Sequence, residues 1–171
     1  ELLAIYNRYP LEELIIHPRV RADFYKNKPN MEVFGQAVKE SKNRLCYNGD
    51  LFIKSHFEAF EKEYPQVERV MLGRGVMVNP GLLNLICEGK SLDKEVLRAF
   101  QDEFYRKNQE VLSGDRAVLF KMKELWFFMI HLFEGAEKAA KKIKKAEKRH
   151  VYEECIERLF SDYPLNQKLV K

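Results

Sequence analysis

The sequence predicts an α/β fold in its first half and an all-α fold in its second half. In the first half, three short runs of strand-forming residues alternate with two longer segments whose apolar residues recur at helical spacing. From residue 92 onward, only the helical spacing continues. Gly89 and Ser91 are typical stop and start signals for helices at this change of pattern. We therefore predict one domain over residues 1–90 and a second, helical domain over residues 91–171.

The predicted strands of the first domain cover residues 14–17 (LIIH), 45–48 (LCYN) and 69–73 (RVMLG). The predicted helices between them cover residues 31–42 and 54–64, and Asn30 is well placed to cap the first of these helices. Strands that alternate with helices in this way are typical of βαβ units, whose strands run parallel. We expect a parallel sheet of about three strands with accompanying helices.

The stretch LCYNGDLF, residues 45–52, allows two interpretations. Asn48-Gly49 between apolar runs is the strongest local signal for a β-hairpin. A hairpin would need a second alternating strand directly after Asp50, but the following apolar residues, such as Phe57 and Phe60, recur at helical spacing. This pattern favours a loop from a strand into a helix.

Four helices are predicted in the second domain, in an arrangement like a four-helix bundle. Ser113-Gly114 and Gly135 mark breaks between them. The second of the four, AVLFKMKELWFFMIHLF, is the most apolar helix of the chain. The four helices are predicted over residues 92–112, 117–133, 136–146 and 151–160.

The composition bounds the cellular setting. Mean hydropathy is −0.45, and no apolar stretch approaches the roughly 18 residues that a membrane span needs. Cys46, Cys87 and Cys155 are widely spaced and lack a ligand-like pattern, so neither a disulfide framework nor a metal site is predicted. Each cysteine has apolar neighbours, which predicts buried thiols in a reducing cytoplasm.

Positive charge is concentrated in the second domain. The net charge is +4, and residues 1–93 hold 13 basic and 13 acidic side chains, so the whole excess lies beyond them. The segment from Lys138 to Arg149 carries seven basic residues and one acid. Such a segment is either the solvated face of a bundle or a surface for a polyanion such as a nucleic acid. The residues predicted to contact nucleic acid here are Lys121, Lys141, Lys142, Lys145 and Arg149.

Two predicted strand ends carry glycine where a ligand could approach the backbone. Gly49 follows the second strand, and Gly73-Arg74 follows the third. Ligands of parallel α/β proteins bind beyond the carboxyl ends of the strands, and glycine N–H groups together with a guanidinium suit a phosphate. The alternative is that both glycines only make tight turns. His17, which ends the first strand, is a further ligand candidate at the same level.

The stretches IIHPRVRADFYKNKPNMEVF, LCYNGDLF, VERVMLGRGVMVNPGLL and VLSGDRAVLFKMKELW together resemble the tRNA-dihydrouridine synthase family. The order of the HxR, NGD and GRG-x3-NP elements carries this resemblance, which covers nearly the whole chain. It implies a TIM (β/α)8 barrel, of which this chain would hold the C-terminal portion, followed by a helical tRNA-binding domain. It also implies reduction of a uridine in tRNA, with FMN as the flavin and NADPH as the source of electrons.

The resemblance also implies roles for single residues. It assigns FMN binding to His17, Asn48, Gly49, Asp50, Gly73 and Arg74. It assigns contact with the tRNA substrate to Arg19 and Arg21. The family more often has Gly-Arg-Thr after the histidine, where this chain has Pro18-Arg19-Val20.

The family's catalytic cysteine belongs to a motif that this chain lacks. The resemblance therefore implies that the catalytic cysteine lies upstream, that the chain is the C-terminal part of the enzyme, and that it is inactive alone. Three strands of a barrel leave sheet edges unpaired, so we expect the chain to self-associate or to form a rearranged half-barrel.

Two other functions remain open at this point. One is another FMN-binding TIM-barrel oxidoreductase, similar to dihydroorotate dehydrogenases. The basic helical segment argues against it, because an enzyme for small molecules has no need of such an extension. The other is an RNA-binding module without catalytic activity.

Overall fold

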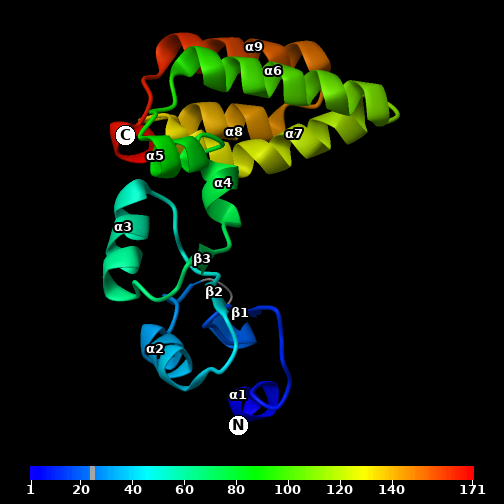
Figure 1. Ribbon diagram of the computed structural model, residues 1–171. Coiled ribbons are helices and arrows are strands. Elements are labelled where there is room, and N and C mark those ends of the chain that lie inside the picture. Colours follow the sequence, from blue (N-terminus) through cyan, green and yellow to red (C-terminus); the bar gives the residue numbers. More distant parts are fainter. Residues whose placement is uncertain (24–25) are drawn as a thin grey trace. The chain divides into compact units, whose positions relative to one another are not determined.

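The computed structural model describes residues 1–23 and 26–171 (Figure 1). Phe24 and Tyr25, which belong to one of the family-like stretches, lie outside the described residues. The chain divides into two compact units. The first comprises residues 1–51 and 55–73, and the second comprises residues 52–54 and 74–171.

The first unit contains a small sheet and its helices. The three strands and the two helices between them agree with the prediction within a few residues, whereas the short helices over residues 2–6 and 21–23 were not predicted. In chain order they are α1 (Leu2–Tyr6), β1 (Leu14–Ile16), η1 (Arg21–Asp23), α2 (Met31–Glu40), β2 (Leu45–Tyr47), α3 (Lys54–Glu63) and β3 (Arg69–Val70).

The three strands form a parallel sheet in the order β1-β2-β3. In this register Ile16 lies opposite Tyr47, and Tyr47 lies opposite Val70. The parallel pairing confirms the βαβ prediction and excludes a hairpin at Asn48-Gly49, which is a loop from β2 into α3. The predicted cap of α2 is also present, because the Asn30 side chain accepts a hydrogen bond from the Val33 N–H at 3.0 Å.

An aromatic cluster joins α2 and α3 to one face of this sheet. The ring of Tyr47 stacks on Phe60 with 4.3 Å between centroids, and Phe34 meets Tyr47 edge-on at 4.9 Å. Tyr64 closes the cluster against Phe34 at 5.2 Å. All four rings are buried. Two βα crossovers of the same hand place both helices on the same face of a parallel sheet, which explains why α2 and α3 share this core.

Burial of Tyr47 predicts that the first unit loses stability in alkaline solution. Desolvation raises the pKa of its phenol to about 12 from an ordinary value of 10.0, so the folded unit holds this proton more tightly than the unfolded chain. This contribution to stability is fully present below about pH 10 and is lost as the pH rises through about 12. Urea titrations followed by circular dichroism should show this loss, and Tyr47→Phe should show less of it. Equal pH dependence of both proteins would contradict the prediction.

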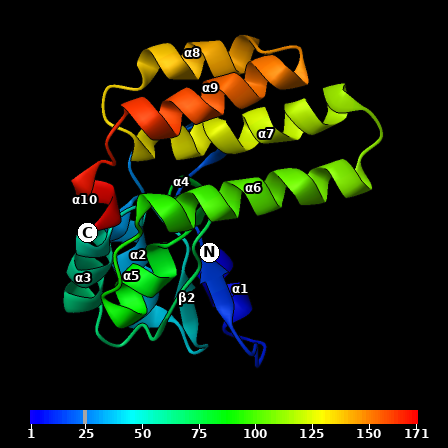
Figure 2. The same ribbon diagram turned by 90° about the horizontal axis from the view of Figure 1, so that it is seen from above.

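The second unit is built from helices. The four helices predicted from sequence correspond to α6, α7 with η2, α8 and α9, which lie side by side in both views (Figures 1 and 2). The elements of this unit are α4 (Arg74–Val78), α5 (Leu82–Glu88), α6 (Lys94–Val111), α7 (Asp115–Met129), η2 (Ile130–Leu132), α8 (Glu137–Lys145), α9 (Arg149–Asp162) and α10 (Gln167–Val170).

The compact units part at Gly73, earlier than the predicted boundary near residue 90. Two hydrogen bonds to the C-terminal end explain why α4 and α5 belong to the helical unit. The Asn79 side-chain amide donates to the Leu169 carbonyl at 2.6 Å, and the Leu92 N–H donates to the Val170 carbonyl at 3.3 Å. The functions assigned to residues 1–90 and 91–171 remain predictions.

The predicted stop at Gly89 is correct, and the predicted start at Ser91 is wrong. Gly89 ends α5 with a φ of 67°, a conformation that favours glycine. The N-cap of α6 is Asp93, whose carboxylate accepts from the Val96 N–H at 2.7 Å. An aspartate two residues further along therefore replaces the serine as the capping group.

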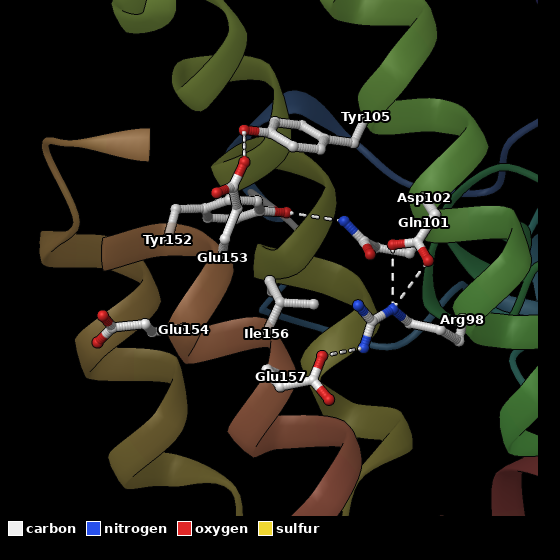
Figure 3. A pocket seen from close by; sticks show the side chains of 9 residues that line it. All are labelled: Arg98, Gln101, Asp102, Tyr105, Tyr152, Glu153, Glu154, Ile156 and Glu157. Carbon is white, nitrogen blue, oxygen red and sulfur yellow. Dashed lines mark hydrogen bonds and ion pairs between the residues drawn. The ribbon is translucent and has the colours of Figure 1, made fainter. Parts of the chain in front are cut away.

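A polar group lies inside the apolar core of the second unit (Figure 3). The hydroxyl oxygen of Tyr152 accepts from Trp126 Nε1–H at 2.9 Å and from Gln101 Nε2–H at 3.3 Å. Gln101 is only 1 % exposed, and within the described residues its Oε1 has no hydrogen-bond partner. These contacts tie α6, α7 and α9 together at one point.

The three cysteines are free thiols with different surroundings. Cys46 is buried and Cys155 is half-buried, and desolvation raises the pKa of both. Cys87 on α5 is exposed, so the prediction of a buried thiol is wrong there. The side chain leaves the helix on the face away from buried Leu82 and Leu85.

Two features are absent from the described residues. No helix among them has the length and apolar character required to cross a membrane. In the same residues, no group of three or more His, Cys, Asp or Glu side chains could hold a metal ion.

Candidate functional site

The carboxyl ends of the three strands lie along one edge of the sheet in the first unit. The Asn48 N–H donates to the Ile16 carbonyl at 2.9 Å, and the Met71 N–H donates to the Tyr47 carbonyl at 2.8 Å. These bonds continue the ladder one residue beyond the strands. The loops that follow therefore start side by side, which is where parallel sheets bind ligands.

His17 is held by the loop after β2. Its Nδ1 lies 2.5 Å from the Asn48 carbonyl oxygen. Because a carbonyl only accepts, Nδ1 is the donor in this contact. The imidazole is exposed. The structure thus brings together two residues predicted to bind the cofactor.

Arg19 and Asp50 form a partly buried ion pair across the same two loops. The Arg19 guanidinium donates two parallel hydrogen bonds to the two carboxylate oxygens of Asp50, one of them at 3.0 Å. Arg19 Nε–H also donates to the Asn27 carbonyl at 2.9 Å. The Arg19 side chain is only 4 % exposed and that of Asp50 is 28 % exposed. A bidentate pair in this position fixes the loop after β2.

This pairing bears on the predicted role of Arg19 as a contact for tRNA. A phosphate needs access to the guanidinium, whereas this one is buried against Asp50 and a backbone carbonyl. A direct RNA contact would require the pair to open. Arg21, the other arginine of this loop, lies exposed in η1.

The two predicted phosphate-binding glycines have different surroundings. A Cβ at Gly49 would lie 1.9 Å from the hydroxyl oxygen of Tyr47, so the ring of Tyr47 excludes any side chain there. A Cβ at Gly73 would meet nothing within 4 Å. Within the described residues, neither glycine N–H donates a hydrogen bond. Both groups are therefore capable of donating to an anion.

Arg74 is the first residue of α4, and it belongs to the second unit. Its guanidinium carbon lies 5.3 Å from the ring centroid of Phe52, which is a cation–π contact within that unit. The predicted combination of Gly49, Gly73 and Arg74 around one phosphate stays a prediction.

The predicted nucleic-acid contacts on the helical unit fall into two groups. Lys121 pairs with Glu124 at 2.8 Å, and Arg149 pairs with Asp115 at 3.0 Å. Lys141, Lys142 and Lys145 are exposed on α8 and form no ion pair with any described residue. The positive charge of these α8 lysines is therefore not offset by a neighbouring acid. At Lys121 and Arg149, an exposed ion pair offsets part of the charge.

Comparison with known families decides the identity of this fold. The family model described as dihydrouridine synthase (Dus) matches residues 4–163. The chain belongs to the dihydrouridine synthase family. A search of curated proteins gave no match to the chain. The match spans both compact units, and it confirms the resemblance noted in the sequence.

Membership of the dihydrouridine synthase family sets the general chemistry. The family has a TIM-barrel fold, makes dihydrouridine in tRNA by reduction, and generally depends on a flavin. The parallel three-stranded sheet is consistent with part of such a barrel. The match also decides against the alternative of an enzyme similar to dihydroorotate dehydrogenases.

Sequence reasoning missed two features of this dihydrouridine synthase chain. The first is the Arg19–Asp50 pair. Both residues follow the ends of adjacent predicted strands, and their opposite charges were the signal that could have predicted a pair. The second is that Lys123 and Lys144 border the same surface as Lys141. The helical spacing of these lysines on α7 and α8 could have indicated a shared surface. The number of lysines in one segment did not indicate it.

Proposed function

We propose that the protein containing this chain reduces a uridine of tRNA to dihydrouridine, with FMN as its flavin and NADPH as the source of electrons. The match of residues 4–163 to the dihydrouridine synthase family carries this proposal. Bound FMN would supply the hydride chemistry, and the protein would position it. A cytoplasmic location is proposed with it, supported by three free cysteines.

The loops at the strand ends are the proposed site for the phosphate end of FMN. Their fit is supported by the Gly49 and Gly73 N–H groups, which donate no hydrogen bond among the described residues. The carboxylate of Asp50 would repel a phosphate, but its pairing with Arg19 neutralises that charge. We propose that His17, Asn48, Gly49 and Gly73 bind the cofactor, that Asp50 shapes their loop, and that Arg74 adds positive charge.

We further propose that the proton donor for the uracil ring and the remaining barrel strands come from outside residues 1–171. None of Cys46, Cys87 and Cys155 stands in the sequence context of the family's catalytic cysteine. Three strands cannot close a barrel. Ile15 of the edge strand β1 is 49 % exposed, and this supports the proposal that copies of the chain associate through this edge.

The helical unit is proposed to hold tRNA through its basic surface. Lys141, Lys142 and Lys145 of α8 supply charge that no described acid pairs. Phosphate contacts of this kind weaken as salt rises, because binding releases counterions. RNA binding by the 171-residue chain should therefore fall steeply with salt concentration.

The decisive test is production of dihydrouridine in a cell that lacks it. The protein containing this chain should restore dihydrouridine in tRNA, measured by mass spectrometry of nucleosides. A folded, flavin-loaded protein that restores none would refute the proposed activity.

The flavin site has a separate test with a matched control. Gly49→Ala places a methyl group against the Tyr47 hydroxyl and should remove the visible flavin absorption of the purified protein. Gly35→Ala adds the same group on α2, where its nearest neighbour is the Tyr64 hydroxyl at 3.5 Å, an ordinary contact. That variant should stay yellow. Retained flavin in Gly49→Ala would contradict the assignment.

A further inference from the structure

An open groove of about 830 Å³ lies on the helical unit, lined mainly by α7 and α8, with Met77 of α4 at one side. Its apolar lining comes chiefly from the phenylalanines of α7. Phe120 is 62 % exposed and Phe127 is 72 % exposed, although both are large apolar side chains. Exposed aromatic patches of this kind on a folded unit indicate a binding surface.

The position of these rings follows from the helical repeat of α7. Leu119, Met122 and Trp126 point into the core of the unit. Phe120 and Phe127 are seven residues apart and therefore share the opposite side of the helix, with Lys123 between them. Two flat rings flanking a lysine thus form one stripe along the groove.

The rim of the groove is positively charged. Lys123 comes from α7, and Lys141 and Lys144 come from α8. None of these three lysines forms an ion pair with a residue in the described part of the chain. Glu124 is the one acid of the lining, and it pairs with Lys121 at 2.8 Å. The groove therefore combines apolar faces with a net positive charge.

We propose that this groove binds unpaired nucleotides of RNA, with bases stacked on Phe120 and Phe127 and phosphates on Lys123, Lys141 and Lys144. A nucleotide strand supplies a flat ring and a negative charge in every repeat, which matches both features of the stripe. A protein partner would need an apolar face that also carries several carboxylates, each positioned to meet one of these lysines. The inference rests on the proposed tRNA function and specifies which part of the RNA this unit holds.

Binding of a labelled single-stranded oligouridylate by the 171-residue chain tests the groove. Phe127→Ala should weaken binding about tenfold, because stacking on one aromatic side chain is removed. The slope of affinity against salt should not change, since no charge is lost. The matched control is Phe100→Ala on α6, whose ring is 38 % exposed and lies outside the groove. This control should bind like the unmodified chain.

The charged rim is tested by a pair of double variants with equal loss of charge. Lys141→Gln with Lys144→Gln should weaken binding and flatten the salt dependence. Lys138→Gln with Lys168→Gln, outside the groove, should do so less. Emission of Trp126, the single tryptophan of the chain and part of the groove lining, should change when RNA binds to the unmodified protein.

Two results would overturn the inference. Equal binding by Phe127→Ala and Phe100→Ala would place the RNA elsewhere on the chain. A Phe127→Ala variant that loses self-association in light scattering, but keeps its RNA affinity, would make the groove a protein interface. Neither result affects dihydrouridine formation as measured by mass spectrometry, so failure of the groove and failure of the proposed activity remain distinguishable.

Discussion

Replacing Asp50 by alanine should lower the free energy of unfolding of the first unit by about 2–3 kcal/mol. The Arg19 guanidinium, 4 % exposed, would then stay buried without the carboxylate that now accepts two of its hydrogen bonds. Removal of one member of a buried pair costs more than the pair itself contributes, because a charge is left in a medium that solvates it poorly. Urea titrations followed by circular dichroism would measure the loss.

Two further variants separate this effect from a simple loss of surface charge. Glu103→Ala removes a carboxylate from an exposed pair with Arg106 on α6, and should cost much less than Asp50→Ala. Adding Arg19→Met to Asp50→Ala removes the buried charge as well, and should recover a large part of the stability. If Asp50→Ala cost as little as Glu103→Ala, the pair would not hold the loop.

The Asp50→Ala variant also tests the proposed cofactor site. The loop after β2 carries Asn48 and Gly49, and the ion pair fixes its far end against Arg19. With the pair removed, the Gly49 N–H would lose its fixed direction. We therefore expect the Asp50→Ala protein to lose flavin, whereas the Glu103→Ala protein keeps it.

The regular elements were predictable because their periods were clear. Phe34 and Ala37 on α2, and Phe57 and Phe60 on α3, follow the helical period, and each strand is a short apolar run bounded by polar residues. The parallel pairing followed from that alternation. Local sequence was enough here, because the hydrophobic face and the secondary structure agree.

The features missed from sequence depend on contacts distant along the chain. Arg19 and Asp50 are 31 residues apart, and only the pairing of β1 with β2 brings them together. The boundary at Gly73 depends on Asn79 reaching Leu169, 90 residues away. Periodicity reports how one element faces its surroundings, but not which other element it meets.

The sequence predicted some parts of the candidate site and missed others. Glycine at the strand ends located the loops, and His17 was placed correctly beside Asn48. The pairing of Arg19 with Asp50 was not predicted, because an arginine that contacts RNA and one that pairs inside the unit look alike in sequence. On the helical unit, density of lysine drew attention to α8, whereas the exposed rings of α7 mark where the groove lies.

Replacing Tyr152 by phenylalanine should lower the free energy of unfolding of the helical unit by about 3 kcal/mol. The hydroxyl oxygen now accepts from Trp126 Nε1–H and from Gln101 Nε2–H, and Figure 3 shows the second of these bonds. Tyr152 is fully buried. Loss of that oxygen leaves two buried donors without a partner, and each unsatisfied group costs about 1–3 kcal/mol. Fluorescence of Trp126 during urea titration would report this transition directly.

The matched control for this variant is Tyr105→Phe. Its hydroxyl donates to the exposed carboxylate of Glu153 at 3.0 Å, where water can replace it, so the loss should stay below about 1 kcal/mol. Gln101→Leu makes the argument sharper, because Gln101 Oε1 already lacks a partner among the described residues. Added to Tyr152→Phe, it removes one of the two orphaned donors and should restore part of the stability. A double variant less stable than Tyr152→Phe alone would show that Gln101 contributes by packing and not through the hydroxyl of Tyr152.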